Sequence, residues 1–351
     1  VHLSEALQKV LQRTLGVPIF QEQVMQIAMV AAGFSGSEAD LLRRSMAAWA
    51  RRGDMGYMRQ RLVEGMLERG YPHSFAMQIF EQIKGFGEYG FPESHAASFA
   101  LLAYVSAWLK RHHPAAFACA LLNSQPMGFY QPAQLVQDAR RHGVTVLPAD
   151  VRYSDWDCAL EGGAGAEPQL RLGLRLIKRL GKSAAERIST ARDDGPFDSA
   201  QGLATRAQLN RRELAALAEA AALRGIAGHR HRAYWEIAGG EKQPRDLLQG
   251  ISRQDNKTTI RPASETDDLK ADYAAMGLSL GRHPLALVRG ALQRHRFKTA
   301  RQLLRLQHGT QTRACGLVTM RQRPMTANGT MFLTLEDETG HVNVVVWQRL
   351  W

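Results

Sequence analysis

Cysteine is scarce in this 351-residue sequence. The three cysteines, Cys119, Cys158 and Cys315, are odd in number and far apart. Such a set forms neither a disulfide framework nor a zinc site, so we expect free thiols in a reducing compartment. Long apolar runs are lacking too, because the longest uncharged stretch, residues 96–109, is shorter than the ~20 residues that span a bilayer. With charged residues near its start and no signal-peptide pattern, the sequence predicts a cytoplasmic protein without a membrane partner.

Acidic residues are in deficit, since 33 Asp and Glu oppose 45 Lys and Arg for a formal charge of +12. Only nine of the cations are lysine, so arginine dominates. Biased codon usage is one explanation, and the fit of guanidinium groups to phosphate is the other. No acidic residue occurs between Asp272 and Glu336, where cations alternate with leucine and phenylalanine. We interpret this stretch as a folded surface for a polyanion, with a solvated helix face that binds nothing as the alternative.

Familiar catalytic and metal-binding patterns are also missing. The sequence has no evident Ser/His/Asp or Cys/His arrangement and no G-x-x-x-x-G-K phosphate loop. His112-His113 and the pair His229 and His231 have no third ligand at metal spacing, so exposed helix ends explain them better. The D-x-D pattern at residues 155–157 lies in a connector without a third carboxylate. We therefore expect no metal site at these positions.

Helical periodicity dominates the first 142 residues. Ser37-Glu38-Ala39-Asp40 is a capping-box pattern, which predicts that a helix begins at Leu41. Residues 96–110 are apolar on almost every side, which predicts a buried helix. The full set of predicted helices covers residues 21–32, 41–52, 58–69, 74–84 and 96–110, with two more starting at Pro114 and Pro132.

After residue 142 the pattern changes from helical to mixed. The sequence predicts a mainly α protein with a C-terminal β segment, and the Gly-, Pro- and Asn-containing residues 240–265 predict a linker. Alternating apolar residues near the C-terminus predict three strands of a small barrel, with turns at Asn328-Gly329 and Thr339-Gly340. The predicted elements are a strand over 144–147, a strand-rich connector over 151–176, helices over 183–235, a helical segment over 285–306, and strands over 315–320, 331–335 and 341–347.

Residues 171–188 resemble a helix-hairpin-helix element. In such a hairpin, backbone N–H groups at a helix start bind a DNA phosphate without reading the base sequence. Gly181 lets the DNA backbone approach, while Lys178, Arg179 and Lys182 supply positive charge. The usual hairpin has two glycines two residues apart, and Arg179 replaces the first of them. An ordinary helical turn is therefore the alternative interpretation.

A second copy of the hairpin is suggested over residues 214–232. Arg224-Gly225-Ile226 and Gly228-His229-Arg230 follow a predicted helix there. Tandem copies favour DNA binding over an ordinary turn. The predicted DNA-binding residues are Lys178, Arg179, Gly181, Lys182 and Arg230.

Three ordered blocks in the first half carry a family resemblance. Residues 20–28 (FQEQVMQIA) resemble the signature YQEQVMQIA, and residues 40–46 (DLLRRSM) resemble the finger-helix pattern ADxLRRAM. Residues 86–101 (FGEYGFPESHAASFAL) resemble FxxYGFxKSHSAAYAL. These blocks resemble the bacterial C-family DNA polymerases of the α-subunit type. Residues 85–100, 122–130 and 316–346 look like the error-prone branch of that family, which acts in damage-induced mutagenesis.

The resemblance covers essentially the whole chain and implies four parts. Polymerase fingers would occupy residues 1–150, and a connector with tandem helix-hairpin-helix elements residues 151–235. A linker and helical segment would occupy residues 236–308, and an incomplete OB-fold residues 309–351. The fold class is then mainly α, made of fingers and hairpins, with this C-terminal β segment.

The resemblance also implies a missing active site. Family members carry metal-binding aspartates in a palm upstream of the fingers, and two-metal phosphoryl transfer needs such carboxylates around Mg²⁺. We find no candidate set here. The chain is thus expected to be part of an error-prone DNA-directed DNA polymerase for translesion synthesis, replication and repair, and to be inactive by itself. The alternative is a stand-alone, non-catalytic DNA-binding protein built from the same modules.

By the resemblance, Arg43 and Arg44 would bind the triphosphate of the incoming nucleotide. Adjacent guanidinium groups can neutralise phosphate charge as an electrostatic clamp. Ser94 and His95 would approach the same nucleotide. The alternative for the arginine pair is surface salt bridges to Glu38 or Asp40.

The implied partners are primer–template DNA and the incoming dNTP. A sliding clamp and accessory mutagenesis proteins are further partners that the family suggests. Residues 243–248 (QPRDLL) are only a distant approximation of a clamp-binding peptide.

Overall fold

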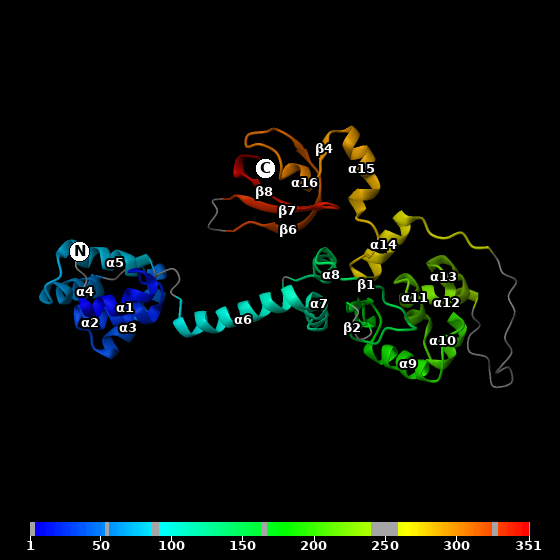
Figure 1. Cartoon of the computed structure of the whole chain (residues 1–351), viewed down its shortest axis with the longest axis horizontal. Coiled ribbons are helices and arrows are strands. Elements are labelled where there is room, and N and C mark those ends of the chain that lie inside the picture. The colour runs from blue at the N-terminus through cyan, green and yellow to red at the C-terminus, as the bar shows by residue number, and fades with distance from the viewer. Residues whose placement is uncertain are drawn as a thin grey trace. The chain divides into compact units, whose positions relative to one another are not determined.

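The computed structural model describes residues 4–52, 56–85, 91–128, 130–162, 167–239, 259–324 and 329–350 (Figure 1). Contacts within the chain divide it into two compact units, Val1–Trp108 and Leu109–Trp351. Each unit is described by itself. Within the described residues, no helix combines the length and the apolar character that crossing a membrane requires.

The first unit is a bundle of short helices around one apolar core. The prediction for residues 21–32 is confirmed at both ends, and Val24, Ile27, Ala28 and Ala31 form the buried stripe. That helix ends at Gly33, whose left-handed φ of 69° suits glycine. The elements before the unit's last helix are α1 (Glu5–Leu11), η1 (Gln12–Thr14), α2 (Gln21–Ala32), α3 (Gly36–Arg52), α4 (Gly56–Glu68) and α5 (His73–Gly85).

Gln23 is a buried polar side chain that fixes the start of α2. Its Oε1 accepts hydrogen bonds from the N–H groups of Ile19 (3.0 Å) and Phe20 (3.2 Å). Its Nε2 donates to the Val10 carbonyl (3.1 Å) and the Thr14 hydroxyl (2.9 Å). Because all its hydrogen-bonding groups have partners, burial of the amide costs little. Gln23, which lies within the FQEQVMQIA block, therefore stabilises the fold.

The start of α3 differs from the sequence prediction. Ser35 and Glu38 form the capping box, because the Glu38 carboxylate accepts the Ser35 N–H (2.7 Å) and the Ser35 hydroxyl accepts the Glu38 N–H (3.2 Å). The helix therefore begins at Gly36, and the prediction that Ser37 opens a helix at Leu41 is wrong. Ser37 has the same three-residue spacing to Asp40, but it lies inside the helix, and Asp40 pairs with Arg43 and Arg44 instead.

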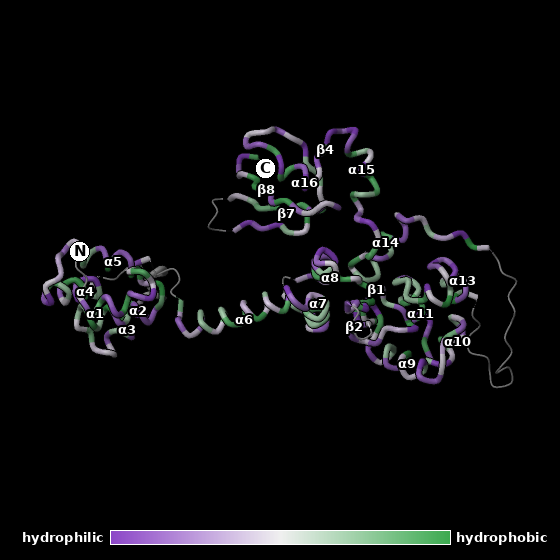
Figure 2. Tube along the Cα trace, in the orientation of Figure 1, coloured by the Kyte–Doolittle hydropathy of each residue, from purple (hydrophilic) through white to green (hydrophobic). Residues whose placement is uncertain are grey.

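The apolar helix α6 (Glu93–His112) is exposed, so the prediction that it is buried is wrong. None of its residues is buried, and hydrophobic segments recur along it in Figure 2. No other described element of the first unit encloses it. Apolar composition alone predicted burial, but burial requires surrounding elements that these residues do not supply.

The second unit has one large core whose residues run from Ala115 to Leu278. Pro114 and Pro132 open their helices as predicted. A small sheet has the order β1-β3-β2, with β1 parallel and β2 antiparallel to β3. Its elements are α7 (Pro114–Asn123), α8 (Pro132–Arg141), β1 (Val146–Leu147), β2 (Ala159–Glu161), β3 (Gln169–Arg171), η2 (Leu174–Leu176), α9 (Lys182–Asp193), α10 (Ala200–Arg206), α11 (Arg211–Glu219), α12 (Arg224–Ala227) and α13 (Arg230–Gly239).

The C-terminal part of this unit ends in an antiparallel sheet of order β6-β7-β8. The three predicted strands are confirmed in type and order. The predicted helical segment over 285–306 is broken at Arg296, whose φ is 62°. Most of the predicted linker, and Asn328 of one predicted turn, lie outside the described residues. The elements are α14 (Glu265–Met276), α15 (Pro284–Arg294), β4 (Phe297–Lys298), α16 (Ala300–Leu303), β5 (Arg313–Ala314), β6 (Leu317–Gln322), β7 (Met331–Asp337), β8 (Gly340–Val346) and η5 (Gln348–Leu350).

Candidate functional site

Arg43 and Arg44 lie on α3, and a single carboxylate holds both of them. Asp40 Oδ1 accepts from Arg43 Nε (3.0 Å) and Nη2 (2.8 Å), and its Oδ2 lies 2.6 Å from Arg44 Nη2. The hydrogen bond from Arg43 is the largest influence on Asp40 and lowers the pKa of that carboxyl. The salt bridge to Asp40 is therefore present, whereas Glu38 pairs with Arg61 instead (3.4 Å).

This ion pairing leaves both guanidinium groups able to bind more oxygens. A guanidinium carries five N–H donors, and Asp40 engages two of those on Arg43. The side chain of Arg44 is 71% exposed and that of Arg43 is 38% exposed. The pair can therefore meet a polyphosphate from the solvent side while Asp40 stays in place.

Ser94 and His95 occupy the first turn of α6, and both are exposed. The His95 ring is tilted against the Phe99 ring, with 4.4 Å between their centroids. No described contact joins Ser94 or His95 to the arginine pair. The structure thus places these four predicted residues on two helices of the first unit without bringing them into direct contact.

The start of α6 is fixed to the start of α2 by two backbone groups. The Gln21 N–H donates to the Phe91 carbonyl (2.9 Å), and the Glu93 N–H donates to Glu22 Oε2 (2.8 Å). Because α2 packs against α3, the first turn of α6 is tied to the helix pair that carries the arginines.

The first hairpin has the backbone that a helix-hairpin-helix element requires. Arg179 has a left-handed φ of 68° at the position where the usual hairpin has its first glycine. Gly181 precedes α9 and provides no side-chain cap, so the first N–H groups of that helix receive no acceptor from it. A Cβ at Gly181 would meet nothing nearer than Ser183 Oγ at 3.9 Å. The chain itself therefore leaves room for a ligand to approach this backbone.

The three cations of the first hairpin are exposed but differ in their partners. Lys178 Nζ donates to the carbonyls of Ala274 (2.9 Å) and Tyr273 (3.3 Å) at the end of α14. Arg179 pairs with Glu219. Lys182 has only a 3.7 Å pair with Glu186 one helical turn away. Of the three hairpin cations, Lys182 therefore makes the weakest contact with the rest of the described chain.

Arg230 is buried, in contrast to the other predicted DNA-binding residues. It is 6% exposed, its Nη2 lies 2.6 Å from Asp272 Oδ1, and its Nη1 pairs with Asp268. Its Nε donates to the Glu219 carbonyl (3.0 Å). Arg230 therefore joins α13 to α11 and α14, and it would have to leave these partners to reach DNA.

The second hairpin differs from the first at its helix start. Gly228 has the left-handed φ of 81° that the turn requires, but His229 Nδ1 accepts the N–H of Arg232 (3.2 Å) and so caps α13. Gly225 is needed for packing, because a Cβ there would lie 2.0 Å from the Arg152 guanidinium. Only the first hairpin leaves its helix start without a side-chain cap.

The acid-poor stretch between Asp272 and Glu336 divides into paired and unpaired cations. Arg289 binds Glu338 (2.5 Å) and Asp337 (3.2 Å), so it holds α15 to the end of β7. A larger group is exposed and makes no ion pair with other described residues. Its members are Arg294, Arg296, Lys298, Arg301, Arg305, Arg313 and Arg321.

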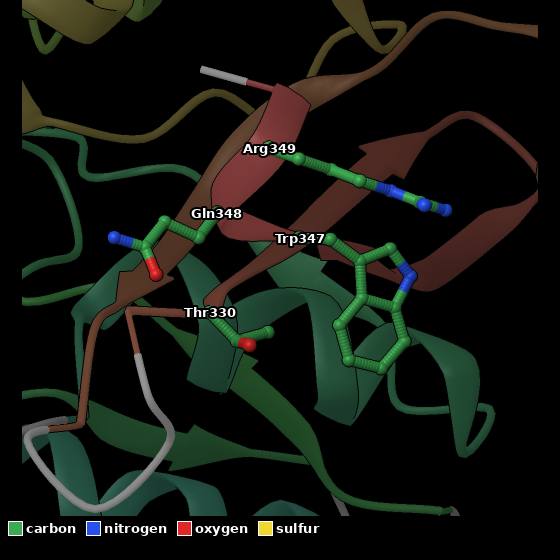
Figure 3. Close-up of a pocket in the computed structure, with 4 residues that line it drawn as sticks. All are labelled: Thr330, Trp347, Gln348 and Arg349. Carbon is green, nitrogen blue, oxygen red and sulfur yellow. The ribbon is translucent and has the colours of Figure 1, made fainter.

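One open pocket of about 630 Å³ lies beside the C-terminal sheet. Thr330, Trp347, Gln348 and Arg349 line it, and the indole and guanidinium of two of them extend on the same side in Figure 3. Trp347 is 55% exposed. An exposed indole can stack on a flat ring, and an arginine that lines the same pocket can bind an anion. The sequence pattern predicts only that Trp347 ends a strand. An aromatic side chain at that strand end is the one sequence signal that points to this pocket.

The described residues contain no group of three His, Cys, Asp or Glu side chains that could hold a metal ion. Both carboxylates of the D-x-D pattern have other partners, since Asp155 accepts from the Ser189 hydroxyl (2.6 Å) and Asp157 binds Arg175 (2.6 Å). Burial raises the pKa of the Cys158 thiol to about 11, which leaves it protonated and unreactive.

Two family descriptions match separate parts of the chain. Residues 1–70 match the bacterial DNA polymerase III alpha subunit finger domain, and residues 143–233 match the helix-hairpin-helix motif. Arg43 and Arg44 lie within the first match. Lys178 and the other predicted DNA-binding residues lie within the second, and α6 lies between the two.

The chain is also similar over nearly its whole length to proteins named error-prone DNA polymerase. It is 59% identical to the protein of Methylococcus capsulatus over 98% of the chain and 59% identical to that of Burkholderia pseudomallei over 99%. It is 55% identical to that of Pseudomonas aeruginosa over 98%. The chain spans about a third of the length of these relatives (34%, 33% and 33%).

Proposed function

We propose that this chain supplies the nucleotide-binding fingers and duplex-binding hairpins of a bacterial error-prone DNA polymerase. Nearly the whole chain is similar to a segment that makes up about one third of the length of such proteins. The observation that carries the proposal is the identity of 55–59% across at least 98% of the chain. The intact protein would be a cytoplasmic DNA-directed DNA polymerase that acts in translesion synthesis, replication and repair.

The proposed division of the chain follows the resemblance. Fingers occupy residues 1–150, the connector and tandem hairpins residues 151–235, and a linker and helical segment residues 236–308. Residues 309–351 begin an OB-fold. The antiparallel β6-β7-β8 sheet supports the last assignment, because three consecutive antiparallel strands are part of that barrel.

In the fingers, Arg43 and Arg44 would bind the triphosphate of the incoming dNTP. Their exposure and the orientation that Asp40 imposes on both guanidinium groups support this role. Positive charge held in place before the reaction stabilises phosphate charge as it develops. Ser94 and His95 would contact the same nucleotide from the first turn of α6.

In the hairpin domain, primer–template DNA would bind through backbone phosphates. The uncapped start of α9 and the approachable backbone at Gly181 support a phosphate at this hairpin, with Lys178, Arg179 and Lys182 around it. Arg230 would act from the interior by holding the second hairpin to α14.

The reaction also requires carboxylates that hold divalent ions, and the described residues do not fit that role. We propose that Mg²⁺ is bound by the part of the polymerase outside these 351 residues, and no catalytic step is assigned to side chains here. The sliding clamp and accessory mutagenesis proteins follow from the family alone, because residues 243–248 lie outside the described residues.

Primer extension tests the proposal. The intact polymerase should extend a primer in Mg²⁺, whereas the 351-residue chain should bind the same DNA but give no product in Mg²⁺ or Mn²⁺. Positioning of substrates without the metal-bound carboxylates leaves the largest source of rate enhancement absent. Extension by the chain alone, abolished by changing Asp155 and Asp157, would contradict the proposal. A complete gene product that binds DNA and has no polymerase activity would support the stand-alone DNA-binding protein.

A further inference from the structure

Arg179 occupies the position of the first hairpin at which the usual sequence has a glycine. Its φ of 68° is left-handed, and this conformation is strained for a residue with a side chain but not for glycine. The guanidinium reaches solvent, since the side chain is 67% exposed. Two residues further on, Gly181 precedes the uncapped start of α9. The hairpin thus carries an arginine, in a strained conformation, next to the backbone that is open to a phosphate.

The partner of this arginine is the carboxylate of Glu219, the last residue of α11. A carboxylate at the C-terminal end of a helix faces the negative end of the helix dipole, which is unfavourable. The helix end is held instead through the backbone, because the Glu219 carbonyl accepts from Arg230 Nε (3.0 Å). The Glu219 side chain is 26% exposed, and its one ion pair among the described residues is with Arg179. Its charge is therefore explained by Arg179 and not by the helix.

A phosphate can replace the partner of Arg179 but not the partners of Lys178. Carboxylate and phosphate both offer negatively charged oxygens in pairs to the fork of N–H donors on a guanidinium. Exchange of one for the other leaves Arg179 fully paired, and Glu219 is exposed enough to be hydrated. Lys178 Nζ, in contrast, donates to the carbonyls of Ala274 (2.9 Å) and Tyr273 (3.3 Å), which end α14 and would lose their donor. The contact suited to exchange is therefore the one between Arg179 and Glu219.

We propose that Glu219 occupies, in the DNA-free chain, the place on Arg179 that a backbone phosphate of duplex DNA takes on binding. This inference rests on the proposed function, in which the first hairpin binds phosphate. Glu219 then holds the affinity of the hairpin below the value that its cations could reach, because the ion pair with Arg179 must break before the phosphate binds. Phosphate contacts carry no base-sequence information, so Glu219 lowers the affinity for all DNA sequences equally.

A double-mutant cycle on the 351-residue chain tests the exchange by titration of labelled duplex. The variants are Glu219→Gln, Arg179→Gln and the two together. The matched control is Glu265→Gln, because Glu265 also pairs with an exposed arginine, Arg282, and opens α14 at the end away from the hairpin. Relative to this control, Glu219→Gln should lower the Kd by roughly 1.5- to 5-fold, the strength of an exposed ion pair that no longer has to break. In the Arg179→Gln background the same change should have no effect beyond that of the control.

Two results would overturn the proposal. An equal gain of affinity with and without Arg179 would show that Glu219 acts only through the general charge of the surface. The same cycle is run with Glu219→Ala, because alanine cannot hydrogen-bond to the guanidinium as glutamine can. No gain beyond the control from either variant would mean that no ion pair is broken on binding. Thermal melting checks that each variant folds, which the backbone contact from Arg230 favours.

Failure of this inference and failure of the proposed function give different results. Duplex binding that depends on the hairpin cations, without coupling between Arg179 and Glu219, refutes the exchange alone. Coupling in the cycle, without primer extension by the intact protein, refutes the polymerase assignment alone. A chain that binds no duplex refutes the proposed hairpin function and the exchange with it.

Discussion

Replacement of the first-hairpin cations is the most direct test of DNA binding by this chain. The triple variant Lys178→Gln, Arg179→Gln and Lys182→Gln removes three positive charges around the uncapped start of α9. The side chains of Arg179 and Lys182 are 67% and 65% exposed, so both reach solvent. Because the contacts would be to phosphates, the loss of affinity should be the same for all DNA sequences.

The salt dependence of binding sets the magnitude. Each phosphate contact contributes ~0.9 to the slope of log K against log salt, so three contacts contribute ~2.7. Between about 50 and about 200 mM salt, the wild-type chain should therefore lose ~40-fold more affinity than the triple variant does. Lys178 and Arg179 already have partners in the fold, which makes this value an upper limit.

The assay is a titration of labelled duplex at four or more salt concentrations. The matched control removes two lysines and one arginine from exposed positions of the first unit, as Lys9→Gln, Arg13→Gln and Lys84→Gln. The control should keep the wild-type slope, and thermal melting checks that both variants fold. Parallel lines for the wild-type chain and the hairpin variant would refute the reasoning, because they would mean that these cations do not meet phosphates.

Three other outcomes follow from the contacts described. In the intact polymerase, Arg43→Ala or Arg44→Ala should raise the KM for dNTP by ~10- to 100-fold, since a charge-assisted contact contributes about 1.5–3 kcal/mol; unchanged steady-state kinetics with a lower Tm would support the salt-bridge role alone. Arg230→Ala should lower the free energy of unfolding by about 1.5–3 kcal/mol, measured by denaturant titration, because two carboxylates and a carbonyl lose a buried donor; wild-type stability would show that the contacts contribute nothing. The His283 ring, whose Nε2 lies 3.5 Å from Glu336 Oε1, is the main cause that lowers the pKa of Glu336. The ionised form of Glu336 therefore stabilises the fold above the ordinary carboxyl pKa, and this stabilisation is lost as the pH falls through the lowered value. Glu336→Gln should weaken the acid dependence of melting, and an unchanged pH profile would contradict that assignment.

Local spacing in the sequence determined most of the secondary structure. The stripe of Val24, Ile27, Ala28 and Ala31 predicted α2 with its bounds, because residues three and four apart share a helix face. Period-two alternation predicted β6, β7 and β8 for the same kind of reason. The position of the hairpin around Gly181 also came from sequence, since the motif is contiguous along the chain.

Contacts between distant segments could not be obtained in this way. Arg230 resembled a DNA-binding cation until its position against Asp268 and Asp272, about forty residues further along, showed that it is buried. Likewise, the sequence offered Glu38 and Asp40 as equivalent partners for the arginine pair on α3. The packing of both α3 and α4 against α2 decided between them, because it placed Arg61 of α4 against Glu38 and left Asp40 to Arg43 and Arg44.

For α6, sequence and tertiary structure each determined a different property. The sequence alone determined that residues 96–109 form an apolar helix, because helix formation and hydrophobicity depend on the residues themselves. The tertiary structure alone decided that this helix is exposed, because burial depends on which other elements surround a segment. The free energy gained by burying an apolar side chain is proportional to the surface area that it removes from water. That area depends on the elements that surround the segment and not on the segment alone.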